Sequence, residues 1–182
     1  LRSKRQWAVQ RIRDGIFTAV AEFFHERSYI KIDSPIISPN ACEGGTELFG
    51  MDYFDEGKVY LSESGQLYLE AAAMAVGRAY DFGPVFRAEK SKTRKHLTEF
   101  WMMDAETAFI THEENMQLQE DMVKYIVSFI LKNYRSELTL LERDTAPLER
   151  LLALPFMRLS YSEAIPKLQS LGSAIQFGDD LG

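Results

Sequence analysis

Cysteine is nearly absent from this sequence of 182 residues, which has only Cys42. A single cysteine excludes an internal disulfide framework and a cysteine-rich metal site, and it is typical of a reducing compartment. No apolar run approaches the roughly 20 residues that a membrane-spanning helix needs. The N-terminal stretch is basic and has no unbroken apolar core of the kind found in signal peptides. We therefore expect a cytoplasmic protein that has no membrane partner.

The sequence also lacks an excess of positive charge. It has 21 Lys and Arg against 27 Asp and Glu, so its formal net charge is -6. Overall charge therefore does not favour non-specific binding to nucleic acids. Any contact with phosphates has to come from a local patch, such as the stretch KSKTRKH (90–96), which places four basic residues in seven positions.

The composition supports the core of one domain, because 46% of the residues are hydrophobic and 12% are aromatic. Residues 4–27 carry apolar side chains at helical spacing, which predicts a long amphipathic helix. The β-branched residues of 29–38 predict a strand, although a proline within it restricts it to an edge, a strand end or an interface. After a glycine-containing loop, we predict a strand at 58–64 and a helix at 65–79.

The second half of the chain predicts a hairpin followed by helices. Residues 82–106 contain two apolar segments around the basic stretch, which predicts a hairpin with a long connection. Thr111 and Glu114 form a T-x-x-E pattern that predicts the capped start of a helix, and the same pattern recurs at 160–163, although Pro166 is unfavourable in the helix that follows. The expected fold class is α/β, with an antiparallel sheet that carries the site and helices that cover its back.

The hairpin carries residues that can bind a phosphate. If the segment around Arg87 is a strand, Arg87 and Glu89 share a face. A guanidinium can hold a phosphate through two parallel hydrogen bonds, and a neighbouring carboxylate can orient it. On the returning strand Phe100, Asp104 and Glu106 share a face, so Phe100 can offer a flat surface to a base. The alternatives are a solvated ion pair, a soluble basic turn and a phenylalanine of the core.

Four stretches resemble motifs of one enzyme family. FRAE (86–89), the basic loop and HLTEFWMMDAE (96–106) together resemble motif 2 of the class II aminoacyl-tRNA synthetases. YIKIDSPIIS (29–38), after a long helix, resembles motif 1. ACEGGTELF (41–49) resembles the loop that closes over the amino acid, and LSESGQLYLEA (61–71) resembles the segment that follows it in the aspartate, asparagine and lysine subgroup. The resemblance extends over almost the whole chain.

The resemblance implies that residues 1–182 are part of a class II catalytic domain, of the α/β (α+β) type with an antiparallel sheet. Motifs 1 and 2 are present, whereas we expect the anticodon-binding OB-fold and motif 3 to be absent from this chain, and we expect the chain to be truncated before motif 3. Motif 1 forms the dimer interface in this class, so the resemblance implies a homodimer, with the long first helix and Pro35 at its interface.

For the nucleotide, the resemblance implies that Arg87 is catalytic. It would grip the α-phosphate of ATP and stabilise the charge that develops there, with Glu89 beside it, His96 near the γ-phosphate and Phe100 under the adenine. No protein nucleophile is needed, because the carboxylate of the amino acid attacks the phosphorus. Magnesium (Mg2+) would bridge the phosphates. The carboxylates that hold the metal are expected outside this chain, so no residue here is assigned to it.

For the other substrates, the resemblance implies that Gln66 holds the backbone end of the amino acid and that Glu43 meets its ammonium group. Ser62 and Glu70 would belong to the same pocket. Three cations of the basic loop would face the acceptor end of tRNA: Lys92, Arg94 and Lys95.

Within the subgroup, the motifs are most similar to the asparaginyl enzymes of bacterial type. Aspartyl enzymes typically carry a lysine where this chain has Leu69, and a pocket without that cation favours a neutral carboxamide over a carboxylate. The alternative is that Leu69 only packs in its helix. The implied activity is a ligase that converts L-asparagine and ATP to asparaginyl adenylate and pyrophosphate, and then esterifies tRNA(Asn). An aspartyl-tRNA synthetase, a synthetase-related asparagine synthetase and a non-catalytic paralogue that binds RNA or protein are the alternatives.

Overall fold

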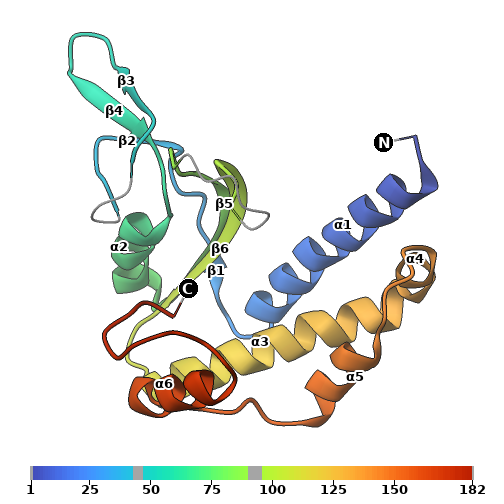
Figure 1. Cartoon of the computed structure of the whole chain (residues 1–182). Helices are drawn as coiled ribbons and strands as arrows, with labels where there is room; N and C mark the ends of the chain where they lie inside the picture. The colour runs from blue at the N-terminus through green and yellow to red at the C-terminus, as the bar shows by residue number, and fades with distance from the viewer. Residues whose placement is uncertain (1, 43–46, 90–95, 182) are drawn as a thin grey trace.

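The computed structural model describes residues 2–42, 47–89 and 96–181. Helices and antiparallel strands together confirm the expected α/β class (Figure 1). In chain order the elements are α1 (Lys4–His25), β1 (Ile30–Lys31), β2 (Ile37–Ser38), β3 (Gly50–Asp52), β4 (Lys58–Leu61), α2 (Gln66–Val76), β5 (Arg78–Phe86), β6 (Glu99–Thr107), α3 (His112–Asn133), α4 (Arg135–Leu140), α5 (Ala146–Ala153) and α6 (Tyr161–Ser170).

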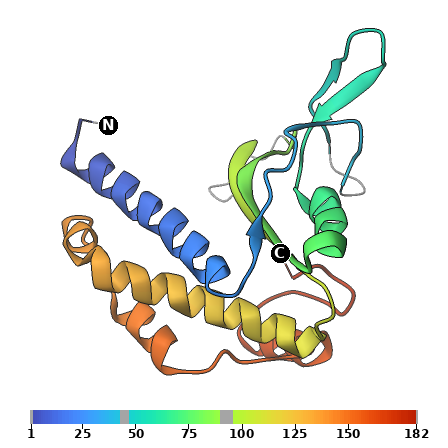
Figure 2. The same cartoon turned by 180° about the vertical axis from the view of Figure 1, so that it is seen from behind.

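The described strands form two sheets of three strands each. In the first sheet β5 and β6 pair in antiparallel, with Val85 opposite Phe100 and Ala79 opposite Glu106. β1 joins the other edge of β5 in parallel, a pairing that the expected antiparallel sheet did not include. In the second sheet β4 lies between β2 and β3, and both pairs are antiparallel. The β3–β4 hairpin projects away from the helices (Figures 1 and 2).

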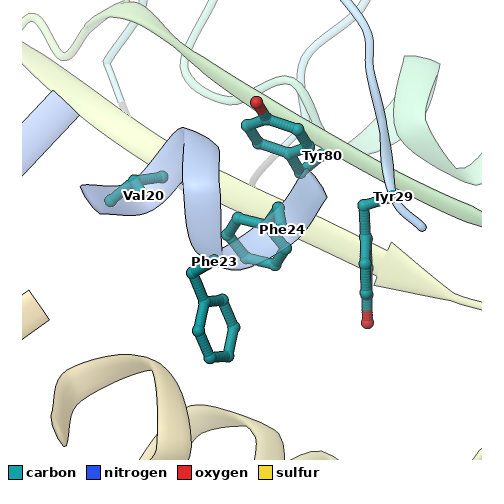
Figure 3. Close-up of a cluster of buried hydrophobic side chains, with 5 residues drawn as sticks. All are labelled: Val20, Phe23, Phe24, Tyr29 and Tyr80. Atoms are coloured by element: carbon teal, nitrogen blue, oxygen red, sulfur yellow. The ribbon is translucent and has the colours of Figure 1, made fainter. Parts of the chain in front are cut away.

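The main core lies between α1, α3 and one face of the β5–β6 pair. α1 buries Val20, Phe23 and Phe24 almost completely. The Phe24 ring stacks on Tyr80 of β5 with 4.7 Å between centroids and meets Tyr29 edge-on at 4.9 Å (Figure 3). Complete burial of a phenylalanine side chain contributes about 1.5–3 kcal/mol. These rings therefore hold α1 on the sheet and leave the opposite face of β5 and β6 for other side chains.

The helix starts follow the capping patterns of the sequence. The Thr111 side chain accepts a hydrogen bond from the Glu114 amide, and the Glu114 carboxylate accepts one from the Thr111 amide, which confirms the predicted capping box. Ser160 and Glu163 form the same box at α6, which continues through Pro166. Within the described ranges, none of the helices is long and apolar enough to span a membrane.

Several strand boundaries differ from the prediction. The strand predicted at 58–64 ends at Leu61, and β5 begins at Arg78, within the helix predicted at 65–79. β5 ends at Phe86, so Arg87 and Glu89 lie beyond the regular strand and not on one of its faces. Residues 29–38 form two strands of two residues each. Pro35 lies between these two strands, which belong to different sheets, and as a proline it has no amide hydrogen to donate to either ladder.

Candidate active site

The residues expected at the nucleotide line one cavity. It has a volume of 330 Å³ and is lined by Arg87, Glu89, His96, Leu97 and Phe100. The guanidinium carbon of Arg87 lies 5.6 Å from the centroid of the half-buried Phe100 ring. A cation and an aromatic ring that share a cavity suit a ligand in which phosphates are linked to an aromatic base.

Backbone hydrogen bonds on two sides hold Arg87 in place. The Arg87 amide donates to the Thr98 carbonyl at 3.0 Å, which continues the hairpin one step past the end of β5. The amides of the two neighbouring residues donate to other segments of the chain. The Phe86 amide donates to the Ser62 carbonyl at 2.9 Å, and the Ala88 amide donates to the Glu47 carbonyl at 2.9 Å. Segments from three parts of the chain therefore fix the backbone of the residue that carries the guanidinium.

A second group of candidate residues lies at the start of α2. The Gln66 side-chain amide donates to the Glu70 carboxylate at 3.0 Å, one helical turn further along. The Cys42 thiol donates to the Gln66 side-chain oxygen at 3.7 Å, and the Cys42 amide donates to buried Glu63 at 3.3 Å. Gln66 and Glu70 are both exposed, so the structure brings these two predicted residues together on an accessible surface.

Asp104 links β6 to the start of α2. Its Oδ2 accepts hydrogen bonds from the Ser64 hydroxyl at 2.8 Å and from the Gly65 amide at 3.0 Å. The Ser64 hydroxyl in turn accepts a bond from the Gln66 amide at 3.1 Å. A Cβ atom on Gly65 would lie 2.7 Å from an Asp81 carboxylate oxygen, so a side chain here would force its neighbours to shift.

Glu106 completes a group of three carboxylates. Burial raises the pKa of Glu106, and the negative charges of Glu70 and Asp104 raise it further. Glu70 and Glu106 also line a cavity of 670 Å³. Neighbouring carboxylates attract an ammonium group. Asp104 and Glu106 are not among the residues expected at the site, although the alternation that places both on the face of Phe100 could have identified them.

Ser62 lies apart from Gln66 and Glu70. Its hydroxyl is buried and donates to the Ser64 carbonyl at 2.8 Å. Together with Pro35, Asp81, Asp104 and other residues it lines a different cavity, of 490 Å³. Asp104 therefore connects this cavity to the start of α2.

The remaining expected residues fall into two groups. Leu69 is fully buried in α2, which agrees with the alternative that it packs in its helix. The other group lies outside the described residues: Glu43, Lys92, Arg94 and Lys95. In the part of the chain that the structure describes, no group of three or more His, Cys, Asp or Glu side chains could hold a metal ion.

Comparisons with known proteins find the same family throughout. The family model described as tRNA synthetases class II (D, K and N) matches residues 1–179. An asparagine–tRNA ligase from Desulforamulus reducens is 56% identical to this chain over 182 residues, which are 100% of the chain and 42% of the relative. The chain thus spans less than half the length of this relative.

Solved structures share the fold. The chain is similar to asparaginyl-tRNA synthetase from Pyrococcus horikoshii complexed with asparaginyl-adenylate, at a TM-score of 0.94 and 38% identity, over 100% of this chain and 41% of that one. It is also similar to the aspartyl-tRNA synthetase from Entamoeba histolytica, at a TM-score of 0.77 and 30% identity, over 100% of this chain and 34% of that one. The fold is therefore common to proteins named for two different amino acids.

Proposed function

The chain belongs to the class II tRNA synthetases of the D, K and N group, and from this we propose that the protein containing it is an asparagine–tRNA ligase. The proposal is supported by the cavity that Arg87, Glu89, His96 and Phe100 share. It is also supported by the name of the relative at 56% identity. The substrates would be L-asparagine, ATP and tRNA(Asn), and the reaction would take place in the cytoplasm.

In the first step the amino acid is activated. An oxygen of the asparagine carboxylate bonds to the α-phosphorus of ATP, while the bond from that phosphorus to the β-phosphate oxygen breaks and pyrophosphate leaves. Arg87 would stabilise the negative charge on the α-phosphate as the bonds change, because its guanidinium can donate two parallel hydrogen bonds. Glu89 would lie beside it, His96 would approach the γ-phosphate, and Phe100 would stack on the adenine.

The amino acid would be bound at the start of α2. The Gln66 amide would hold its backbone end, Glu43 would meet its ammonium group, and Glu70 would belong to the surrounding pocket. Ser62 would act from the neighbouring cavity that Asp104 connects to this end. The face of β6 supports this arrangement. Phe100 and Asp104 lie on the same face, four residues apart, which is ~13 Å along a strand. A ligand with an adenine at one end and an ammonium group at the other fits a site of this length.

The charges at this end favour asparagine over aspartate. Glu70, Asp104 and Glu106 lie close enough to raise the pKa of Glu106. A second carboxylate on the substrate would be repelled there, whereas a neutral carboxamide would not. Leu69 adds no cation to offset this repulsion. An aspartyl-tRNA synthetase is therefore the second candidate, favoured only by the shared fold.

In the second step a hydroxyl of the 3′ end of tRNA attacks the activated carbonyl, and AMP leaves. Lys92, Arg94 and Lys95 would contact the phosphates of the acceptor end. Mg2+ would enter with ATP and offset the charge of its phosphates. The described residues do not form a site for it, so we assign it no protein ligand and derive no step through it.

A homodimer is part of the proposal. Pro35 is exposed, and Ile36 and Ile37 beside it are each 45% exposed. Apolar side chains in contact with one another at a surface favour an interface. Sedimentation of the full-length protein tests this, and a monomer at micromolar concentration would contradict it.

The activity is tested by exchange of pyrophosphate into ATP, measured on the full-length protein with asparagine and, separately, with aspartate. We expect exchange with asparagine and none above background with aspartate. Exchange with aspartate alone would refute the asparagine assignment, and transfer to tRNA or to ammonia would then distinguish an aspartyl-tRNA synthetase from an asparagine synthetase. Silence with both amino acids would refute the ligase and favour the non-catalytic paralogue.

A further inference from the structure

Two side chains from different parts of the chain hold the side-chain carboxamide of Gln66. Its nitrogen donates to the Glu70 carboxylate at 3.0 Å, one turn further along α2. Its oxygen accepts a hydrogen bond from the Cys42 thiol at 3.7 Å. The Gln66 backbone amide is fixed as well, because it donates to the Ser64 hydroxyl at 3.1 Å. The residue proposed to hold the amino acid is therefore restrained in both its backbone and its side chain.

These contacts select one of the two orientations that a carboxamide can adopt. An ionised carboxylate only accepts hydrogen bonds, so Glu70 selects the nitrogen of Gln66. A thiol is a weak donor, which suits the oxygen at Cys42. In the opposite orientation the Gln66 oxygen would face the Glu70 carboxylate, and the two acceptors would repel each other. The oxygen has two lone pairs, so it can accept one bond from Cys42 and a second from an ammonium group.

The position of Cys42 is set by the core. The buried Glu63 carboxylate accepts a hydrogen bond from the Cys42 amide at 3.3 Å. This contact joins residues 21 positions apart, and the contact of the thiol with Gln66 joins residues 24 positions apart. The Gln66 oxygen is thus held by a segment that only the tertiary fold brings to α2, in addition to the local bond within the helix.

We infer that Glu70 and Cys42 are positioning residues, which hold the Gln66 carboxamide with its oxygen ready for the ammonium group of the amino acid. The inference rests on the proposed function, in which Gln66 holds the backbone end of asparagine. A side chain that is fixed before binding does not have to be ordered by the substrate, and this strengthens binding. Glu70 and Cys42 would therefore act on asparagine through Gln66.

The test measures pyrophosphate exchange on the full-length protein and separates KM for asparagine from KM for ATP. Glu70→Ala should raise KM for asparagine by about 2–12-fold, the effect of one flexible side chain that has to be ordered on binding. Glu70→Gln should raise it by at most about 2-fold, because a carboxamide there can still offer an oxygen and keep at least half of the molecules in the competent orientation. KM for ATP should be unchanged in both variants.

A double-mutant cycle shows whether the two residues act through Gln66. In a Gln66→Ala background, which itself raises KM for asparagine, neither Glu70→Ala nor Cys42→Ala should raise it further. In the wild-type background Cys42→Ala should raise it, whereas Cys42→Ser should stay close to the wild-type value because a hydroxyl is also a donor. A direct effect of Glu70 on the substrate would persist without the Gln66 side chain.

The matched control is a second carboxamide that is held in the same way but lies in α3. The Gln117 nitrogen donates to the Asp121 carboxylate at 2.8 Å, also four positions further along its helix, and its oxygen accepts a bond from Arg158 at 2.9 Å. Asp121→Ala removes the same type of hydrogen bond as Glu70→Ala. We expect it to leave KM for asparagine unchanged, since Gln117 has no part in the proposed site.

An unchanged KM for asparagine in Glu70→Ala would overturn the inference. An equal rise in the wild-type and Gln66→Ala backgrounds would also overturn it, as would an equal rise in the Asp121→Ala control. Exchange by the wild type separates these failures from failure of the proposed function. If the wild type exchanges pyrophosphate with asparagine but the cycle shows no coupling, only the inference is wrong. If the wild type shows no exchange, the ligase proposal is wrong and the inference falls with it.

Discussion

Replacement of Gly65 by alanine tests how closely the start of α2 is packed against the sheet. The backbone of Gly65 has φ -79° and ψ -5°, which alanine adopts without strain. The added methyl group would instead lie 2.7 Å from an Asp81 carboxylate oxygen, 2.7 Å from the Ser34 hydroxyl and 3.3 Å from the Ser34 Cβ. Asp81 is buried and accepts a hydrogen bond from the Ser34 amide at 3.2 Å, so it cannot move without loss of that bond.

Two opposing effects determine the magnitude at Gly65. Overpacking of a filled site costs about 1–3 kcal/mol, whereas a glycine-to-alanine change at a compatible backbone stabilises by about 0.4–1 kcal/mol. The net expectation is a loss of about 1–2 kcal/mol, concentrated where α2 meets Asp104 and Asp81. A loss of this size accelerates local opening by a factor of about 5–30.

Hydrogen exchange of the α2 amides in the full-length protein measures this opening directly. Gly83→Ala is the matched control, because the nearest atom to its new methyl group, an Asp81 carboxylate oxygen, lies at 3.5 Å, an ordinary contact distance. We expect faster exchange in Gly65→Ala and unchanged or slower exchange in Gly83→Ala. Protection in Gly65→Ala equal to or greater than that of the wild type would refute the close-packing argument.

Three further substitutions address the chemistry of the site. Arg87→Lys keeps the charge but loses the two parallel hydrogen bonds, so pyrophosphate exchange should fall by about 10²–10³-fold; a loss below 10-fold would exclude a direct contact with the reacting phosphate. Phe100→Leu keeps an apolar side chain but removes the stacking surface, which is worth about 1–3 kcal/mol per base. KM for ATP should therefore rise with little change in kcat. An unchanged KM would mean that Phe100 is a residue of the core and does not stack on the adenine. The raised pKa of Glu106 means that the folded state binds its proton more tightly than the unfolded state, so stability should fall as pH rises from about 4.5 through the raised value. Glu106→Gln should therefore raise Tm at pH 7 and lose this advantage below pH 4.5; equal Tm values at pH 7 would contradict the carboxylate cluster.

The site depends on segments that are distant in sequence but meet at the end of β5. The amides of Phe86, Arg87 and Ala88 donate alternately to Ser62, Thr98 and Glu47. Residues that are held by backbone hydrogen bonds on both sides lose little conformational entropy when a ligand binds. This arrangement explains how a short irregular segment beyond a strand can position the guanidinium of Arg87.

The sequence alone determined the features that depend on local interactions. The capping box of Thr111 and Glu114 involves residues three positions apart, so its pattern is readable without the fold. The alternation that places Phe100 and Asp104 on one face of β6 follows from the strand period, and the register with β5 agrees with it. That Arg87, Glu89, His96 and Phe100 share a cavity could also be anticipated, because they lie within 14 positions of one another around a single hairpin.

Only the tertiary structure decided the features that depend on distant contacts. The end of β5 at Phe86 follows from hydrogen bonds to Ser62 and Glu47, which no pattern around residue 86 reveals. The pKa of Glu106 is raised by burial and by Glu70, a residue of another element. Leu69 is fully buried because of what packs around α2, whereas its sequence context left its role open. Burial and charge proximity are sums over neighbours in space, and the chain assembles those neighbours only when it folds.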